Sequence, residues 1–300
     1  MAETSIEWTD QVWNPTRGCS RVSPGCQNCY AMCQAHRFNT KGGAYEGLTR
    51  IRHGHVDWSG AVRLVPENLQ LPFQWKKPQR VFVDSMSDLF HPKVPFDFVD
   101  RVFGVMDATS RHTYQILTKR PERMAEYVND PDTPRRVLAL PGLHQTNWPL
   151  PNVWLGTSVE DQKAADERIP HLLRTPAAIK FLSCEPLLGP VDISPHLNYL
   201  LNNGALGSFW IICGGESGPK ARPMNVDWAR LLRDQCQAAG VAFFFKQHGS
   251  WIDDSQTAAL GGVRRKFFGR EYVRQSKHDN QLLDGEVHRA FPAEARKVVV

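Results

Sequence analysis

Six short apolar segments recur along the chain, and each ends abruptly in polar residues or glycine. They begin at residues 81, 114, 153, 179, 209 and 241, so that their starts lie 26 to 39 residues apart. That spacing leaves room in each repeat for a strand, a loop, a helix and a return loop. Segments that are apolar on both faces are typical of parallel strands covered by helices. The repetition therefore predicts an α/β chain built around a parallel sheet.

The intervals between these segments contain amphipathic stretches that predict helices. They lie at 96–110, 121–130, 162–175 and 226–240, with Gly240 as a stop signal and Pro170 as a break or a new turn. The Pro-rich stretch 128–152 does not fit this pattern and predicts a surface loop. A further strand near 11–17 brings the number of strand–helix steps to about seven. We therefore expect a parallel TIM-type barrel, complete or partial, over residues 1–249, and a polar extension or cap over 250–300. An open doubly wound sheet is the alternative, but its usual Gly-rich phosphate loop is not evident.

Composition narrows the class of protein. Hydrophobic residues make up 41% of the chain and charged residues 22%, which is typical of a globular fold. No apolar run approaches the roughly 18 residues that a membrane span needs, and the N-terminus lacks the features of a secretory signal. We therefore expect a cytoplasmic protein with no membrane partner. The net charge of +5 permits a nucleic acid or nucleotide as substrate without demanding one.

Four cysteines lie within fifteen residues, in the loop 18–33 that follows the first expected strand. Cys19, Cys26 and Cys29 have the spacing C-x6-C-x2-C, and Cys33 follows four residues later. Four thiolates would suit a structural zinc ion, whereas three would suit an iron–sulfur cluster with one iron open for another ligand. The end of the first strand is where a barrel enzyme places its active site, which favours the second interpretation.

Several motifs resemble known families. NPTRGC and GCQNCYA resemble the cluster loop of radical S-adenosylmethionine enzymes of the spore photoproduct lyase type, although three extra residues separate the first two cysteines. The blocks VFVDSMSDLFHPKVP, ILTKRPERM, VWLGTSVED, FLSCEPLLGP and IICGGESGPKARPM resemble a phage-associated three-Cys-motif family of unknown function over residues 7–292. The resemblance implies a radical-SAM-like fold, a [4Fe–4S] cluster held by Cys19, Cys26 and Cys29, and S-adenosylmethionine as cofactor. Tyr30, directly after the third cysteine, supports it, and Cys33 is expected not to be a ligand.

Polar residues at the ends of the other strands are the remaining candidate site residues, because the carboxyl ends of barrel strands carry the chemistry. We expect cofactor contacts from Ser85, Ser87, Asp88, Thr157, Ser158, Gly214, Gly215 and Glu216. We expect catalytic roles for Glu185, Lys246 and His248. Each has a structural alternative: the serines and Asp88 could cap helices, the glycines could form a tight turn, and a lone histidine is more often structural.

The sequence favours a radical S-adenosylmethionine enzyme that receives electrons from a donor such as a flavodoxin or ferredoxin. The stretch 264–274, in which basic and aromatic residues are mixed, favours a nucleic acid or nucleotide as substrate, although a solvated hairpin would look the same. One alternative is a zinc-stabilised nucleic-acid-binding protein without catalysis. Another is a barrel hydrolase that uses Glu185 and Glu216, which would leave the cysteines unexplained.

Overall fold

The computed structural model describes residues 4, 6–139, 147–257, 262–274 and 281–293. Seven strands form one sheet in the order β1-β6-β7-β8-β9-β10-β11. Their bounds are Gln11–Trp13, Arg80–Val83, Thr113–Thr118, Val153–Ser158, Ile179–Cys184, Phe209–Gly214 and Ala242–Gln247. The pairs β1–β6, β6–β7, β7–β8 and β10–β11 are all parallel.

The strand order confirms the predicted fold class. The seven strands lie side by side in the same order in which they follow one another along the chain, as the strands of a TIM-type barrel do. In a doubly wound sheet, the strand order would reverse at one point within the sheet. Strands β1 and β11 are the two ends of this order within the described residues, so the barrel topology is partial.

The helices fill the intervals between strands. They are α1 Tyr30–Arg37, α2 Leu71–Gln74, α3 Phe96–Ala108, α4 Pro121–Asn129, α5 Thr133–Leu138, α6 Gln162–Arg174, α7 Ser194–Asn202 and α8 Val226–Ala239. In helix α8, two residues define the ends: the Asn225 side chain accepts a hydrogen bond from the Asp227 amide at the start, and Gly240 adopts φ 70° after the last turn. The helices predicted at 96–110, 121–130 and 226–240 are confirmed.

Two expectations about prolines were wrong. Helix α6 continues through Pro170, where a break or a new turn was predicted. The proline is exposed, while its neighbour Ile169 and the later Leu172 are fully buried, so packing holds both turns in one helix. The Pro-rich stretch 128–152 was predicted as a surface loop, yet it contains α5, in which a proline occupies the first turn. Proline is tolerated there because its missing amide would have no helical partner.

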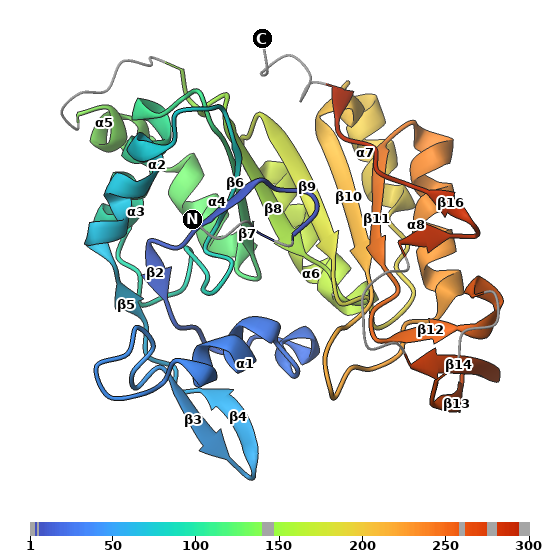
Figure 1. The fold of residues 1–300 in the computed structure, drawn as a ribbon. Coiled ribbons are helices and arrows are strands. Elements are labelled where there is room, and N and C mark those ends of the chain that lie inside the picture. The colour runs from blue at the N-terminus through green and yellow to red at the C-terminus, as the bar shows by residue number, and fades with distance from the viewer. Residues whose placement is uncertain (1–3, 5, 140–146, 258–261, 275–280, 294–300) are drawn as a thin grey trace. The chain divides into compact units, whose positions relative to one another are not determined.

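Contacts divide the chain into two compact units. The first unit comprises residues 1–157 and 170–180, and the second comprises 158–169 and 181–297. In the first unit, α1 packs on the hairpin of β3 (Thr49–Arg52) and β4 (His55–Trp58), as Figure 1 shows. A short ladder joins β2 (Thr16–Arg17) to β5 (Arg63–Leu64).

In the second unit, α8 packs on β10 and β11, and α7 lies beside α8 (Figure 1). Beyond residue 250 a three-stranded antiparallel sheet has the order β12-β14-β13, with bounds Trp251–Asp253, Arg270–Arg274 and Arg264–Phe267. A ladder of Leu282–Leu283 (β15) and Glu286–Val287 (β16) follows. The hairpin expected in the polar extension is therefore present, while 258–261, 275–280 and 294–300 lie outside the described residues. A domain boundary at 249/250 stays a prediction.

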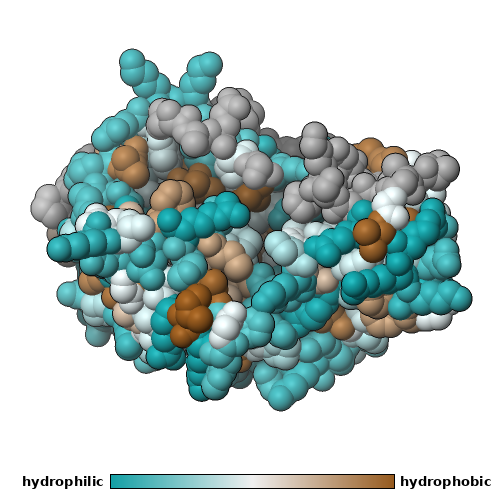
Figure 2. Space-filling model, turned by 60° about the horizontal axis from the view of Figure 1, so that its bottom comes forward, coloured by the Kyte–Doolittle hydropathy of each residue, from teal (hydrophilic) through white to brown (hydrophobic). Residues whose placement is uncertain are grey.

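The visible surface in Figure 2 is largely hydrophilic, and its hydrophobic residues form small, separate patches. Among the helices of the described ranges, none combines the length and apolar character needed to cross a membrane.

Candidate functional site

The three predicted ligands lie on one loop between β2 and α1. Cys26 ends a short 3-10 helix, and Cys29 is the residue directly before α1. Gly18, which precedes Cys19, has φ +88°, and a Cβ atom there would lie 2.4 Å from the carbonyl oxygen of Ala61. Only glycine fits this approach, so the backbone contact fixes where the cysteine loop begins.

The thiols of this loop influence one another electrostatically. Burial raises the pKa of the Cys19 thiol to about 12, and negative charge on Cys29 and Cys26 adds to the rise. Burial also raises the pKa of the Cys29 thiol, while the backbone N–H groups of Met32 and Ala31 at the start of α1 lower it. The charge of one thiol therefore affects the pKa of another, and the first turn of α1 offers hydrogen bonds to the Cys29 sulfur.

This donor set fits the ligands of an iron–sulfur cluster. Such clusters are held by thiolates, and hydrogen bonds to sulfur together with solvent exposure tune their potential. Cys33 is exposed and lies within α1, one turn beyond Cys29. In the part of the chain that the structure describes, no group of three or more His, Cys, Asp or Glu side chains is arranged to hold a metal ion. The fit therefore rests on donor chemistry, and the roles of Cys19, Cys26 and Cys29 stay predictions.

An arginine from the end of β7 holds the cysteine loop. The Arg120 guanidinium donates to Asp88 at 2.6 Å and lies 3.9 Å from the Cys19 sulfur. It also donates to the Ser20 carbonyl and hydroxyl oxygens at 3.0 and 2.9 Å. Asp88 accepts a further bond from the Thr118 hydroxyl at 2.7 Å. Asp88, predicted to contact a cofactor, thus orients the cation beside Cys19.

Other predicted cofactor residues also lie around this loop. The Tyr30 hydroxyl donates to the Ser85 carbonyl oxygen at 2.7 Å, and the Ser85 hydroxyl donates to the Asn14 side chain at 3.3 Å. The Ser87 hydroxyl donates to the Gly18 carbonyl oxygen at 2.7 Å. Sequence reasoning predicted a role for these side chains but missed Asn14, the partner of Ser85, although it lies in the NPTRGC segment.

A buried carboxyl group of the same region has a displaced pKa. Asp84 accepts hydrogen bonds from the Thr16 amide at 3.0 Å and the Thr16 hydroxyl at 2.8 Å. Burial raises the pKa of Asp84 to about 8, the two Thr16 bonds oppose the rise, and the Asp88 charge adds to it. The folded protein therefore keeps a proton on Asp84 at pH values where the unfolded chain has lost it.

We expect the free energy of unfolding to fall as pH rises from about 4 to about 8, because the folded state binds the extra proton in that window. Within this window, each unit of pH lowers the free energy of unfolding by at most about 1.4 kcal/mol. Asp84→Asn resembles the protonated carboxyl and removes this dependence, so its melting temperature should exceed that of the wild type by more at pH 8 than at pH 4. Asp97→Asn, which removes an exposed carboxyl of the same unit, is the control; an equal pH response in both variants would contradict the assignment.

Thr157 and Ser158, at the end of β8, are engaged within the fold. The Thr157 hydroxyl donates to the Thr118 carbonyl oxygen at 2.9 Å. The Ser158 carbonyl oxygen accepts from Arg168 at 2.7 Å, and Arg168 also pairs with the buried Glu160 at 2.8 Å. Both residues are fully or almost fully buried. Their contacts with a cofactor stay predictions.

In the second unit, two predicted catalytic residues form an ion pair. The Lys246 ammonium lies 3.0 Å from a carboxylate oxygen of Glu185, and both side chains are partly exposed. The Ser183 hydroxyl donates to the other carboxylate oxygen at 3.4 Å. Gly214 lies against this pair, since a Cβ on it would be 2.8 Å from Glu185. The ends of β9, β10 and β11 thus bring three predicted site residues together.

The remaining predicted residues of this unit are held within its loops. A Cβ atom on Gly215 would lie 1.9 Å from the His248 carbonyl oxygen, so two backbone segments meet there. Glu216 accepts three hydrogen bonds from Arg222, at 2.8, 2.9 and 2.5 Å. The buried His248 ring makes a 2.8 Å hydrogen bond to the Leu282 carbonyl oxygen, and burial lowers the pKa of His248. Close packing of the backbone therefore explains why glycine is needed at Gly215, in addition to the predicted contact with a ligand.

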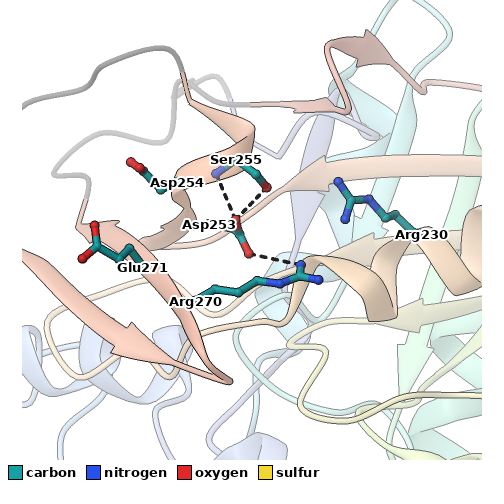
Figure 3. A pocket seen from close by; sticks show the side chains of 6 residues that line it. All are labelled: Arg230, Asp253, Asp254, Ser255, Arg270 and Glu271. Carbon is teal, nitrogen blue, oxygen red and sulfur yellow. Dashed lines mark hydrogen bonds and ion pairs between the residues drawn. The ribbon is translucent and has the colours of Figure 1, made fainter.

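A pocket of about 460 Å³ in the second unit was not predicted. Figure 3 shows its lining: Arg230, Asp253, Asp254, Ser255, Arg270 and Glu271. The buried Asp253 accepts from the Ser255 amide at 3.0 Å and from Arg270 at 3.4 Å. These side chains come from α8, β12, β14 and the turn after β12, so no local sequence signal joins them.

One protein family has a model that matches residues 3–292, and its description is "Protein of unknown function (DUF5131)". The chain belongs to this family. A comparison with curated proteins gave no match. Among solved structures, a mutant of spore photoproduct lyase is similar, with 10% sequence identity and a TM-score of 0.40. That similarity covers 92% of this chain and 72% of the other.

The family match contains every predicted site residue, from Cys19 to His248. The structure gathers one set around the cysteine loop of the first unit and another at the ends of β9 to β11 in the second. Whether the two sets serve one site stays a prediction.

Proposed function

We propose that the protein is a radical S-adenosylmethionine enzyme in which Cys19, Cys26 and Cys29 hold a [4Fe–4S] cluster. The observation that supports the proposal is that three thiols lie on one loop, where the charge of one affects the pKa of another, while Cys33 is exposed. Three cysteine ligands leave one iron open for a cofactor. When bound, the reduced cluster supplies the electron that splits S-adenosylmethionine into methionine and a 5′-deoxyadenosyl radical.

Residues of the first unit would set the charge and position of the cysteine loop. The Arg120 guanidinium, 3.9 Å from the Cys19 sulfur, would offset the negative charge of thiolate ligands. Asp88 would act as a positioning residue, because its 2.6 Å ion pair fixes Arg120. Tyr30 would brace the loop through its bond to the Ser85 carbonyl.

In the second unit, Glu185 and Lys246 would be available to a bound ligand. Their ion pair is partly exposed, and a carboxylate and an ammonium group can exchange that pairing for the charged ends of a methionyl moiety or substrate. We propose a nucleic acid or nucleotide as substrate and a flavodoxin or ferredoxin as electron donor, in the cytoplasm.

Cleavage of the cofactor tests the proposal. Anaerobically reconstituted protein with a strong reductant should convert S-adenosylmethionine to 5′-deoxyadenosine and methionine, slowly even without substrate. Chromatography with mass detection measures the nucleoside. Cys26→Ser should give none, because a ligand is lost, whereas Cys33→Ser should match the wild type. An intact cluster that neither binds nor cleaves the cofactor would make it a structural group or an electron carrier.

A further inference from the structure

One hairpin of the chain carries a local excess of positive charge. Residues 264–274 carry five cations and one anion, a net charge of +4, whereas all 300 residues together carry +5. The cations are Arg264, Arg265, Lys266, Arg270 and Arg274. A local excess of this kind, on one element, is the usual electrostatic footprint of a nucleic-acid-binding surface.

The hairpin presents its first strand at the edge of a sheet. Among the described residues, strand β13 pairs only with β14 in the order β12-β14-β13, with Arg265 opposite Tyr272 and Lys266 opposite Glu271. Three successive residues of β13, Arg264 to Lys266, are exposed. An exposed edge strand with side chains on both faces can follow a flexible polymer backbone.

Two of these cations are available to a ligand. Arg264 pairs with Asp254 at 2.8 Å and with Glu271 at 3.5 Å. Arg265 and Lys266 have no ion pair within the described ranges of the chain. The Arg265 guanidinium lies 5.6 Å above the centre of the Trp251 ring, a contact that positions the cation without neutralising its charge.

The tip of the hairpin holds an aromatic ring in an unfavourable backbone conformation. Phe268 has φ 52° and Gly269 has φ 75°, the conformation of a tight turn whose first position usually takes asparagine, aspartate or glycine. A bulky residue at positive φ is strained. Phe268 is nevertheless 50% exposed, with edge contacts to Trp228 and Tyr272. Strain retained at an exposed ring points to use of that ring by a ligand.

We infer that the β13–β14 hairpin binds single-stranded nucleic acid, with Arg265 and Lys266 on the phosphates and Phe268 stacked on a base. Aromatic rings between cations are the arrangement by which proteins grip unpaired strands, and stacking needs an exposed base face. The claim that this nucleic acid is the enzyme's substrate rests on the proposed function. The binding itself requires no cluster.

Fluorescence anisotropy of the full chain with labelled oligothymidylate and oligouridylate of about twelve nucleotides tests the inference. Arg265→Ala/Lys266→Ala should weaken binding about tenfold or more at about 0.1 M salt. It should also lower the slope of log K against log salt by about 1.4, since each lost phosphate contact on a single strand contributes about 0.7. The matched control Arg135→Ala/Lys163→Ala removes the same charge from side chains that are 86% and 83% exposed. It should retain wild-type affinity.

Phe268→Asn separates stacking from charge. Asparagine tolerates positive φ, so the variant should fold at least as stably as the wild type while binding at least about fivefold more weakly, with an unchanged salt slope. Equal losses in the hairpin and control variants would overturn the inference, as would polyglutamate competing as well as the oligonucleotides. If the protein binds the oligonucleotides but cannot be reconstituted with a cluster, the proposed function is refuted and this inference stands. If the protein holds a cluster and cleaves the cofactor but binds no oligonucleotide, this inference is refuted and the proposed function stands.

Discussion

Replacing Cys19, Cys26 or Cys29 with serine is expected to abolish the iron–sulfur cluster, whereas Cys33→Ser is expected to retain it. Wild-type protein reconstituted without oxygen should contain about four irons per chain. Each variant of a ligand should contain far less, because two thiolates hold a cluster poorly and serine is a harder, weaker donor. Iron and sulfide analysis, together with the absorbance spectrum, measures the result. Cys33 differs because it is exposed and lies within α1, beyond the loop that holds the other three cysteines.

The Cys33 variant is also the control for handling and folding, since it removes one thiol from the same helix and loop. Circular dichroism of all four variants should show the same secondary structure. One zinc per chain with no iron-dependent absorbance would contradict the proposal and favour a structural metal. Loss of the metal in the Cys33 variant as well would show four thiolate ligands.

The main elements of the fold could be predicted because their signals are local. Strand β10 was predicted from an unbroken apolar run, and all six of its residues are buried. Helix α8 carries its own start and stop signals in Asn225 and Gly240. Prolines misled the prediction because their effect depends on position: Pro134 opens α5, and Pro170 is carried within α6 by the burial of its neighbours.

The candidate site was only partly predictable. The short spacing of the cysteines on one loop predicted that Cys19 and Cys29 belong to one group, and in the structure the charge of Cys29 affects the pKa of Cys19. The end of β6 correctly indicated that Asp88 lies near them, but its partner Arg120 is 32 residues away, and pairing at that separation leaves no local trace. The same holds for Glu185 and Lys246, which meet only because β9, β10 and β11 are consecutive in the sheet.

The GGESG segment shows how one pattern can have two physical causes. Paired glycines predicted close approach of the backbone to a ligand. In the structure, the neighbour at Gly215 is the backbone of the KQHG segment: the Gly215 amide donates to the Gln247 carbonyl oxygen at 2.9 Å, and the Ser250 amide donates to the Glu216 carbonyl oxygen at 2.9 Å. The packing explanation and the ligand-binding explanation therefore predict different results for a substitution of Gly215.

Gly215→Ala is accordingly expected to lower the free energy of unfolding by about 3 kcal/mol, because its methyl group would lie 1.9 Å from the His248 carbonyl oxygen and force two backbone segments apart. Denaturant unfolding followed by circular dichroism measures the loss. Gly189→Ala is the matched control in the same unit: its Cβ would meet Asp161 at 3.4 Å, an ordinary contact, so little change is expected. If Gly215→Ala unfolds like the wild type yet binds S-adenosylmethionine more weakly, the glycine pair serves a ligand and the packing explanation fails.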